Sequence, residues 1–425
     1  MRRVPAPFGW VPTPIGWGIF CLIVVVTVTV KTHFIWAGNL QSSVLEGDFR
    51  DAIWGPAHGL IHGLNPFISD QVYQTQYGTP TAALYTPDIY LAMAPAALVP
   101  FTAGAIIFFI AMLVSTWATV LVVIRPWSAD RLIMGALFGA LVMFSLPSEY
   151  GLAFGQPAAL LAFGAALTIR AAVKGDTGVT AVIGVTIVLL KVQTGLPIVL
   201  VLLAMAMYRV VTRAVALTLV LSIPGLIAEV RAAHGILGVL RTWRTNLHFY
   251  TLNSTAMRMR VDLAGTGYRL SNYDITVLSF LFGIAISVIA VLVIRRLEPG
   301  LWMWPFISSF LTLALYHQQY DVLIPLLCFL PIMLEFHYDF RVWLTCFSIL
   351  LVDLLCRPSF AAHWINLLNV TPATFIGALS TFTTFALLFM MCLLIVSVSV
   401  EQKYRNNRTP LHTGDGEPSS SSLTR

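Results

Sequence analysis

Long runs of apolar residues, separated by short polar segments, make up most of this chain of 425 residues. A helix that spans a bilayer needs about 20 mainly apolar residues, because every backbone polar group in lipid must be paired inside the segment. The runs predict an all-α polytopic membrane protein, since the strands of a β-barrel would alternate apolar and polar positions. About twelve transmembrane helices are expected, over residues 15–34, 87–124, 132–147, 156–170, 177–190, 195–208, 214–230, 275–294, 301–316, 322–334, 342–356 and 373–398.

Two of these runs need a closer interpretation. The run 87–124 is too long for one span, and proline breaks a helix, so we expect a short helix to end at Pro95 or Pro100 and another to follow. The run 15–34 follows two arginines and resembles a signal peptide. It is too long for one and lacks a cleavage site of small residues, so we interpret it as an uncleaved first span.

Composition supports the membrane assignment. The chain is 58% hydrophobic and 10% charged, whereas soluble proteins average about 25% charged residues. The net charge of +6 does not indicate nucleic-acid binding, because the basic residues are spread between apolar segments instead of forming one stripe. The five cysteines form no CxxC pair and have no histidine at ligand spacing, so neither a disulfide framework nor a metal site is predicted.

The distribution of basic residues predicts the orientation, because Lys and Arg in short loops stay on the cytoplasmic side. One set of loops, which includes both termini, carries fifteen of the 25 Lys and Arg residues. Most of the others lie in one long loop, 231–274, on the opposite side. We therefore expect cytoplasmic termini in a cell-membrane protein, with residues 1–14 as a cytoplasmic segment, 15–400 as one integral membrane domain and 401–425 as a disordered cytoplasmic tail.

This orientation brings the polar interruptions of the chain to the outer face together. They are the first outer loop 35–86, the segment from Glu149 to Gln156, Lys191 to Thr194, the basic loop 231–274, and His317 to Asp321. The count of Lys and Arg residues did not impose this grouping of polar segments. The grouping predicts that the outer face is the functional one.

An acidic stretch in the first outer loop supplies the leading candidate for chemistry. Asp48 follows the first span, with Glu46 and Asp51 close by in sequence. A carboxylate at the water edge of a bilayer is well placed to act as a base on a lipid-borne substrate, and like charges raise its pKa. The alternative is that Asp48 caps a surface helix that begins at Phe49.

The segment from Trp54 to Phe67 mixes apolar residues with histidines and ends in Gly63-Leu64-Asn65-Pro66. This pattern is typical of a half-buried interfacial helix that is stopped by glycine and proline. His58 and His62 lie four apart, which is the spacing of a two-histidine metal clip, but no third ligand is evident. The interfacial interpretation is favoured over a metal site.

Several cationic and polar residues are candidates for holding a phosphate. An outward-facing enzyme lacks nucleotide sugars, and the chain contains no nucleotide-binding glycine motif, so its activated substrate would be lipid-borne. Arginine suits the departing phosphate because its planar fork gives two charge-assisted hydrogen bonds. The alternative is contact with anionic lipid headgroups. The candidates in the basic loop are Arg241, Arg244, Arg258 and Arg260.

Two ionisable residues interrupt apolar runs elsewhere. Lys191 lies between the runs 177–190 and 195–208, and His317 opens the segment between 301–316 and 322–334. Ionisable groups bounded by membrane segments are functional candidates, and the alternative is an ordinary interfacial loop residue. A functional role is favoured for His317, and both interpretations stay open for Lys191.

These residues fall in an order that resembles the polyprenyl-phosphate-sugar-dependent GT-C glycosyltransferases, within them glycosyltransferase family 87. The resemblance covers most of the chain, and each motif by itself is weak. It rests on Gly47-Asp48-Phe49, Gly63-Leu64-Asn65-Pro66-Phe67, Tyr85-Thr86-Pro87, Leu98-Val99-Pro100, Gly155-Gln156-Pro157, Lys191 before Pro197, Asn253-Ser254 ahead of Arg258 and Arg260, and His317 near Tyr320.

The resemblance implies a GT-C fold with interfacial helices in the first outer loop, an inverting transfer without metal or cofactor, and Asp48 as base. It implies a contact of His317 with the donor phosphate or the acceptor, and adds Gln156 and Asn253 to the substrate-binding candidates. Similar proteins include actinobacterial mannosyltransferases of phosphatidylinositol mannosides and lipomannan. Three positions depart from the family pattern. Phe67 follows Pro66 where the family has tyrosine, and Val192 follows Lys191 where it has proline. Leu315-Tyr316 precede His317 where the mannosyltransferases have Ser-x-Trp.

The sequence thus predicts a membrane glycosyltransferase that moves a sugar, with mannose favoured, from a polyprenyl-phosphate donor to a glycolipid or lipoglycan hydroxyl on the outer face. One alternative is an arabinofuranosyltransferase that uses polyprenyl-phosphate-arabinose. A transporter or flippase of lipid-linked sugars is a second alternative, but polar groups near the bilayer midplane would be expected for it. A scaffold subunit of an envelope-synthesis complex is a third.

Overall fold

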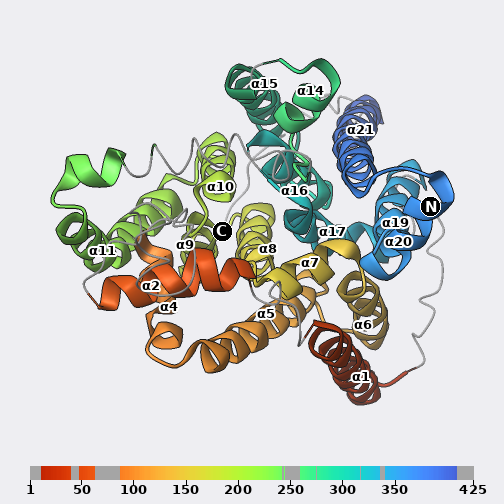
Figure 1. Cartoon of the computed structure of the whole chain (residues 1–425). Coiled ribbons are helices and arrows are strands. Elements are labelled where there is room, and N and C mark those ends of the chain that lie inside the picture. The colour runs from red at the N-terminus through yellow and green to blue at the C-terminus, as the bar shows by residue number, and fades with distance from the viewer. Residues whose placement is uncertain are drawn as a thin grey trace, which may run out of the picture.

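The computed structural model describes residues 11–39, 47–62, 87–241, 244, 259–273, 275–315, 317–335 and 340–408. Within these ranges the regular structure is helical, apart from an isolated antiparallel bridge between Arg260 and Gln318. The all-helical prediction is therefore confirmed for the described part of the chain. Figure 1 shows the helices arranged around a central helix, α8 (Ala158–Lys174).

Among the described residues, five helices are long and apolar enough to cross a membrane. They lie in α1 (Thr13–Asn39), α5 (Phe101–Val123), α11 (Tyr208–Ala232), α15 (Ile275–Arg296) and α21 (Pro372–Arg408). The number rises to seven if each of two bent pairs is one span. One pair is α6 (Ala129–Met143) with α7 (Leu146–Phe154), bent by 64°, and the other is α19 (Phe340–Leu355) with α20 (Pro358–Leu368), bent by 88°.

Twelve full-length spans are not confirmed, because several of the expected ones are apolar helices that are too short to cross a bilayer. Hydropathy alone does not separate such a short helix from a span. The short elements are α9 (Val179–Leu189), α10 (Val192–Ala204), α16 (Met303–Ala314), and the consecutive η2 (Gln319–Val322), α17 (Leu323–Cys328) and α18 (Leu330–Leu334).

The predicted break in the long second run is confirmed. The helix α4 (Pro87–Ala97) contains Pro95 and ends before Pro100, which precedes α5 with an extended backbone, φ −52° and ψ 147°. At the other end of the chain, α21 stays helical through Arg408, past residue 401, where the polar tail was expected to begin. The rest of that tail lies outside the described residues.

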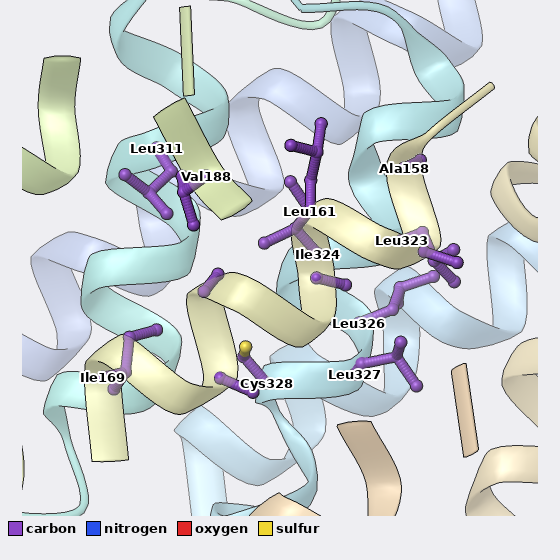
Figure 2. Packing of buried hydrophobic residues seen from close by; sticks show 14 of the residues in the cluster. Ala158, Leu161, Ile169, Val188, Leu311, Leu323, Ile324, Leu326, Leu327 and Cys328 are labelled. Atoms are coloured by element: carbon purple, nitrogen blue, oxygen red, sulfur yellow. The ribbon is translucent and has the colours of Figure 1, made fainter. Parts of the chain in front are cut away.

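The central packing depends on small residues. Helix α8 buries a row of alanines against α5, α9, α16 and α17, and Figure 2 shows Leu161 and Ile169 of α8 among Val188, Leu311 and Ile324. A Cβ built on Gly164 of α8 would lie only 2.9 Å from the carbonyl oxygen of Gly184 in α9. Larger residues at this contact would push the two helices apart.

The loop 35–86 is helical over residues 47–61. The π-helix η1 (Phe49–Trp54) leads into α2 (Gly55–Ile61), which pack against α4. The ring of Phe49 is fully buried and stacks on Phe108 of α5, with ring centroids 4.4 Å apart. An interfacial helix was predicted over 54–67, and residues 63–67 lie outside the described part. The contact with α5 fixes the position of the neighbouring Asp48.

Candidate active site

Asp48 does not act as a helix cap. Its backbone is already helical, with φ −70° and ψ −34°, and its side chain makes no capping hydrogen bond to η1. Instead, the Asp48 carboxylate accepts a hydrogen bond from the Nε2 amide of Gln156. The capping interpretation is therefore wrong, and two of the sequence candidates that lie 108 positions apart are in direct contact.

The turn between α7 and α8 places Gln156. Gly155 ends α7 in the left-handed region, with φ 73°, which glycine adopts without a steric penalty. The N–H of Gln156 then donates to the carbonyl of Gly151 over 2.8 Å, and Pro157 opens α8. Only 5% of Gln156 is exposed, so its amide is held toward Asp48 and not free in solvent.

The surroundings of Asp48 raise its pKa above the usual value. Burial is the largest cause, and the hydrogen bond from Gln156 opposes it by stabilising the ionised form. The negative charge of Asp51 raises the pKa further, while the positive charge of Lys191 lowers it. A carboxylate with a raised pKa is a stronger base once ionised, which suits proton abstraction from a hydroxyl.

Lys191 forms a buried ion pair with Asp321. Its Nζ lies 2.8 Å from both carboxylate oxygens, and the two side chains are 5% and 1% exposed. Lys191 has an extended backbone just before α10, so its side chain leaves the helix axis, and its Nζ lies 5.3 Å from the ring centroid of Tyr320. The interfacial-loop interpretation of Lys191 does not fit this burial.

His317 completes this group as its third member. Its side chain is fully buried, with Nδ1 3.1 Å from Oδ2 of Asp321. The same oxygen accepts from the backbone N–H of Gln318. Burial alone would raise the pKa of Asp321, but the nearby Lys191 and His317 lower it below its usual range. Asp321 therefore stays ionised and fixes the positions of Lys191 and His317.

Arg260 lies in a second buried pair beside His317. Its Nε and Nη2 donate to the two carboxylate oxygens of Asp262 over 2.7 and 2.8 Å. Asp262 also accepts from the backbone N–H of His317, and the N–H of Val261 donates to the His317 carbonyl over 3.0 Å. Asp262 caps α14 (Leu263–Ser271) by accepting from Gly265. These bonds hold the segment before η2 in place.

The remaining candidates are not part of these contacts. Arg241 and Arg244 are exposed on the segment after α11, while Arg258 and Asn253 lie outside the described residues. The ring nitrogens of His58 and His62 hydrogen-bond backbone carbonyls, His58 with Ala97 and His62 with His58 itself. Among the described residues, no group of three or more His, Cys, Asp or Glu side chains is arranged to hold a metal ion.

Sequence reasoning assigned no chemical role to Asp321 or Asp262. Asp321 follows His317 by four positions and Asp262 follows Arg260 by two, so each acid stands near a candidate cation in the sequence. That proximity was the available signal. Pairing His317 and Arg260 with the acid that follows each of them most closely in the sequence would have identified both residues.

Comparison with known proteins decides the family. The sequence pattern of glycosyltransferase family 87 matches residues 83–316, more than half of the chain. The chain belongs to glycosyltransferase family 87. The matched range includes Gln156, Lys191 and Arg260 but neither Asp48 nor Asp321. Among curated proteins, no relative of this family 87 chain was matched.

Membership makes the protein a glycosyltransferase with membrane helices, acting on a sugar donor and an acceptor. The geometry around Asp48 fits that chemistry. A half-buried carboxylate oriented by an amide lies within the field of a lysine, and the lysine is itself fixed by an acid that also contacts a histidine. These are the elements that a base and an electrostatic anchor require.

Proposed function

We propose that this family 87 enzyme transfers a sugar, with mannose favoured, from a polyprenyl-phosphate donor to a hydroxyl of a glycolipid or lipoglycan. In this proposal the reaction takes place on the outer face of the cell membrane, the termini are cytoplasmic, and the fold is of the GT-C type with about twelve spans. The observation that carries it is the hydrogen bond of the half-buried Asp48 with Gln156, beside the charge of Lys191.

In the proposed reaction, Asp48 removes the proton of the acceptor hydroxyl. The acceptor oxygen attacks the anomeric carbon, and the bond from that carbon to the phosphate oxygen of the donor breaks, which inverts the configuration. The bonding electron pair leaves with the polyprenyl phosphate. Gln156 orients the carboxylate, so that the lone pair of Asp48 faces the acceptor.

The departing phosphate needs cationic donors. Two hydrogen bonds of the Lys191 ammonium go to Asp321, and a third N–H is left for a ligand. We assign further phosphate contacts to the basic loop, through Arg241, Arg244 and Arg258, with Asn253 as a polar contact. His317 and Arg260 are buried in ion pairs, so we assign to them the positioning of Asp321 and its segment instead of a direct phosphate contact.

The two carboxylates of η1 provide a matched test. Asp51 is ionically paired with Arg50 at 2.7 Å, only three positions from Asp48. Purified protein in nanodiscs would be offered labelled polyprenyl-phosphate-mannose and, separately, polyprenyl-phosphate-arabinose with membrane glycolipid acceptors. Asp48→Asn is expected to lower transfer by about 10³-fold, within the range of general-base catalysis. Asp51→Asn should stay within a few-fold of the unmodified protein.

The outcomes separate the alternatives. Transfer from the mannose donor alone supports the proposal, and transfer from the arabinose donor alone replaces the sugar. Full activity of Asp48→Asn would remove Asp48 from the mechanism. If both donors bind and neither is used, the flippase alternative gains weight.

A further inference from the structure

A second charged cluster, formed by Lys31, Glu149 and Arg357, lies on the other side of α7 from the ion pair of Lys191 with Asp321. Glu149 and Gly151 are two positions apart in α7, so they point toward nearly opposite faces of this helix. A Cβ built on Gly151 would lie 3.8 Å from Cβ of Tyr320, whose ring packs under Lys191. Glu149 instead faces α1, where its Oε2 lies 3.4 Å from Nζ of Lys31.

This cluster holds more positive than negative charge. Lys31 lies within the first span and is only 1% exposed, while the Glu149 side chain is 25% exposed. Arg357, which precedes α20, lies close enough for its charge to act on Lys31. Lys31 pairs with Glu149, and among the described residues no ion pair of Arg357 is found. A buried excess charge is unfavourable unless it is paired, so an anion is expected here.

Arg357 has unused hydrogen-bonding capacity. Its Nε is buried and has no hydrogen-bond partner among the described residues. Its guanidinium lies 4.6 Å from the ring centroid of Phe360, which holds the planar group from one side. A structural pair of Lys31 with Glu149 accounts for the contact of α1 with α7. It leaves the arginine without a role.

Apolar side chains are exposed on the surfaces around this cluster. The sharp bend between α19 and α20 turns α20 away from the span axis, and α20 exposes Phe360, Leu367 and Leu368 by 44%, 64% and 58%. On α1, Phe34 is 66% exposed. Exposed apolar side chains on both sides of a cationic cluster suit a ligand with acyl chains beside a charged headgroup.

We propose that Lys31 and Arg357 bind the anionic phosphodiester of a membrane lipid. The single negative charge of a phosphodiester balances the excess charge of Lys31, Arg357 and Glu149. The guanidinium of Arg357 donates to two phosphate oxygens, and the ammonium of Lys31 contributes the second charge. The site is separate from that of the sugar donor, with α7 between them.

Native mass spectrometry of the purified full chain tests this site directly. The protein in detergent is titrated with phosphatidylglycerol and, separately, with phosphatidylcholine, whose headgroup has no net charge. The unmodified protein should retain phosphatidylglycerol preferentially. Arg357→Gln should reduce its binding about fivefold, since one cation near a membrane surface contributes about 1 kcal/mol. Arg357→Lys should keep part of the preference, which separates loss of charge from misfolding.

Arg231→Gln is the matched control, because Arg231 is exposed near the end of α11. It should leave the preference unchanged. Equal behaviour of Arg357→Gln and Arg231→Gln, or equal binding of the two lipids, would overturn the proposal. Competition with glycerol phosphate distinguishes the source of the phosphate: displacement supports a site for any phosphate ester, and retention supports a lipid site. None of these readouts depends on sugar transfer.

Discussion

The two ends of the helical bundle differ in their most deeply buried charges. At the end that contains Asp48, the ion pairs of Lys191 with Asp321 and of Arg260 with Asp262 have side chains no more than 5% exposed. At the opposite end, Arg131 pairs with Glu335, and these side chains are 29% and 36% exposed. Helices α5 and α8 run from one end to the other.

This difference has an energetic meaning. An exposed ion pair contributes about 0–1 kcal/mol to stability, whereas burying two charges costs several kcal/mol before their attraction is counted. Stability alone therefore does not explain two buried pairs at one end. Charges that are buried, fixed and close to a possible base are typical of a catalytic site. At the opposite end, the more exposed pair of Arg131 with Glu335 avoids most of this cost.

The largest effect on stability is expected at Lys191. Lys191→Met leaves the Asp321 carboxylate buried without its lysine partner, and breaking such a pair costs about 3–5 kcal/mol. Unfolding in detergent, followed by circular dichroism, would measure the loss. The double variant with Asp321→Leu removes both charges and should recover much of the stability. A double variant as unstable as the single one would contradict this account.

The second-largest effect is expected at His317, on the rate of sugar transfer and not on stability. His317→Gln keeps a hydrogen-bonding group beside Asp321 but changes its position, and misplacing a site by 1 Å lowers rates by up to about 100-fold. We expect reduced kcat with a nearly unchanged unfolding midpoint. The control is His62→Gln, because His62 is exposed and bonds a carbonyl of its own helix. Similar rates for both variants would exclude a positioning role of His317.

The pH dependence should move in opposite directions in two variants. Asp48 acts as a base only when ionised. The Gln156 hydrogen bond lowers its pKa, so Gln156→Leu raises the pKa of Asp48 and moves the acidic limb of kcat/KM to higher pH. Asp51 raises that pKa, so Asp51→Asn moves the limb to lower pH. Profiles measured on both variants that shift the same way would argue against Asp48 as the base.

The smallest effect is expected at the opposite end. Arg131→Gln removes the half-exposed partner of Glu335, which should change the free energy of unfolding by less than about 1 kcal/mol. Transfer should stay at the level of the unmodified protein. A loss comparable to that of Lys191→Met would mean that the two ends do not differ in the way described.

The sequence allowed much of the fold to be predicted. The helices and the break before Pro100 follow from local apolar runs and proline chemistry. The number of spans did not follow, because α9, α10 and α16 are as apolar as the long spanning helices but have only 11 to 13 residues. Their length is set by packing against α8 and its neighbours, which hydropathy does not encode.

Several residues of the candidate site could be named from the sequence, but the contacts between them could not. The polar interruptions at Asp48, Gln156, Lys191 and His317 were identified from the sequence, and the structure brings them to one end. Whether Asp48 caps its own helix or meets Gln156 depends on a turn more than a hundred residues away. Likewise, the partner of Lys191 is chosen by tertiary packing, so local patterns left its role open.

The contact between Lys191 and Asp321 also constrains how the protein is made. The two residues are separated by 130 positions, so a growing chain inserts α9 and α10 long before the acid is synthesised. Until then the lysine is best accommodated at the membrane surface, where water solvates it. Helix α10 therefore reaches its final position only after η2 has been synthesised. Biosynthetic intermediates that end before residue 321 should remain loosely assembled and exposed to membrane proteases.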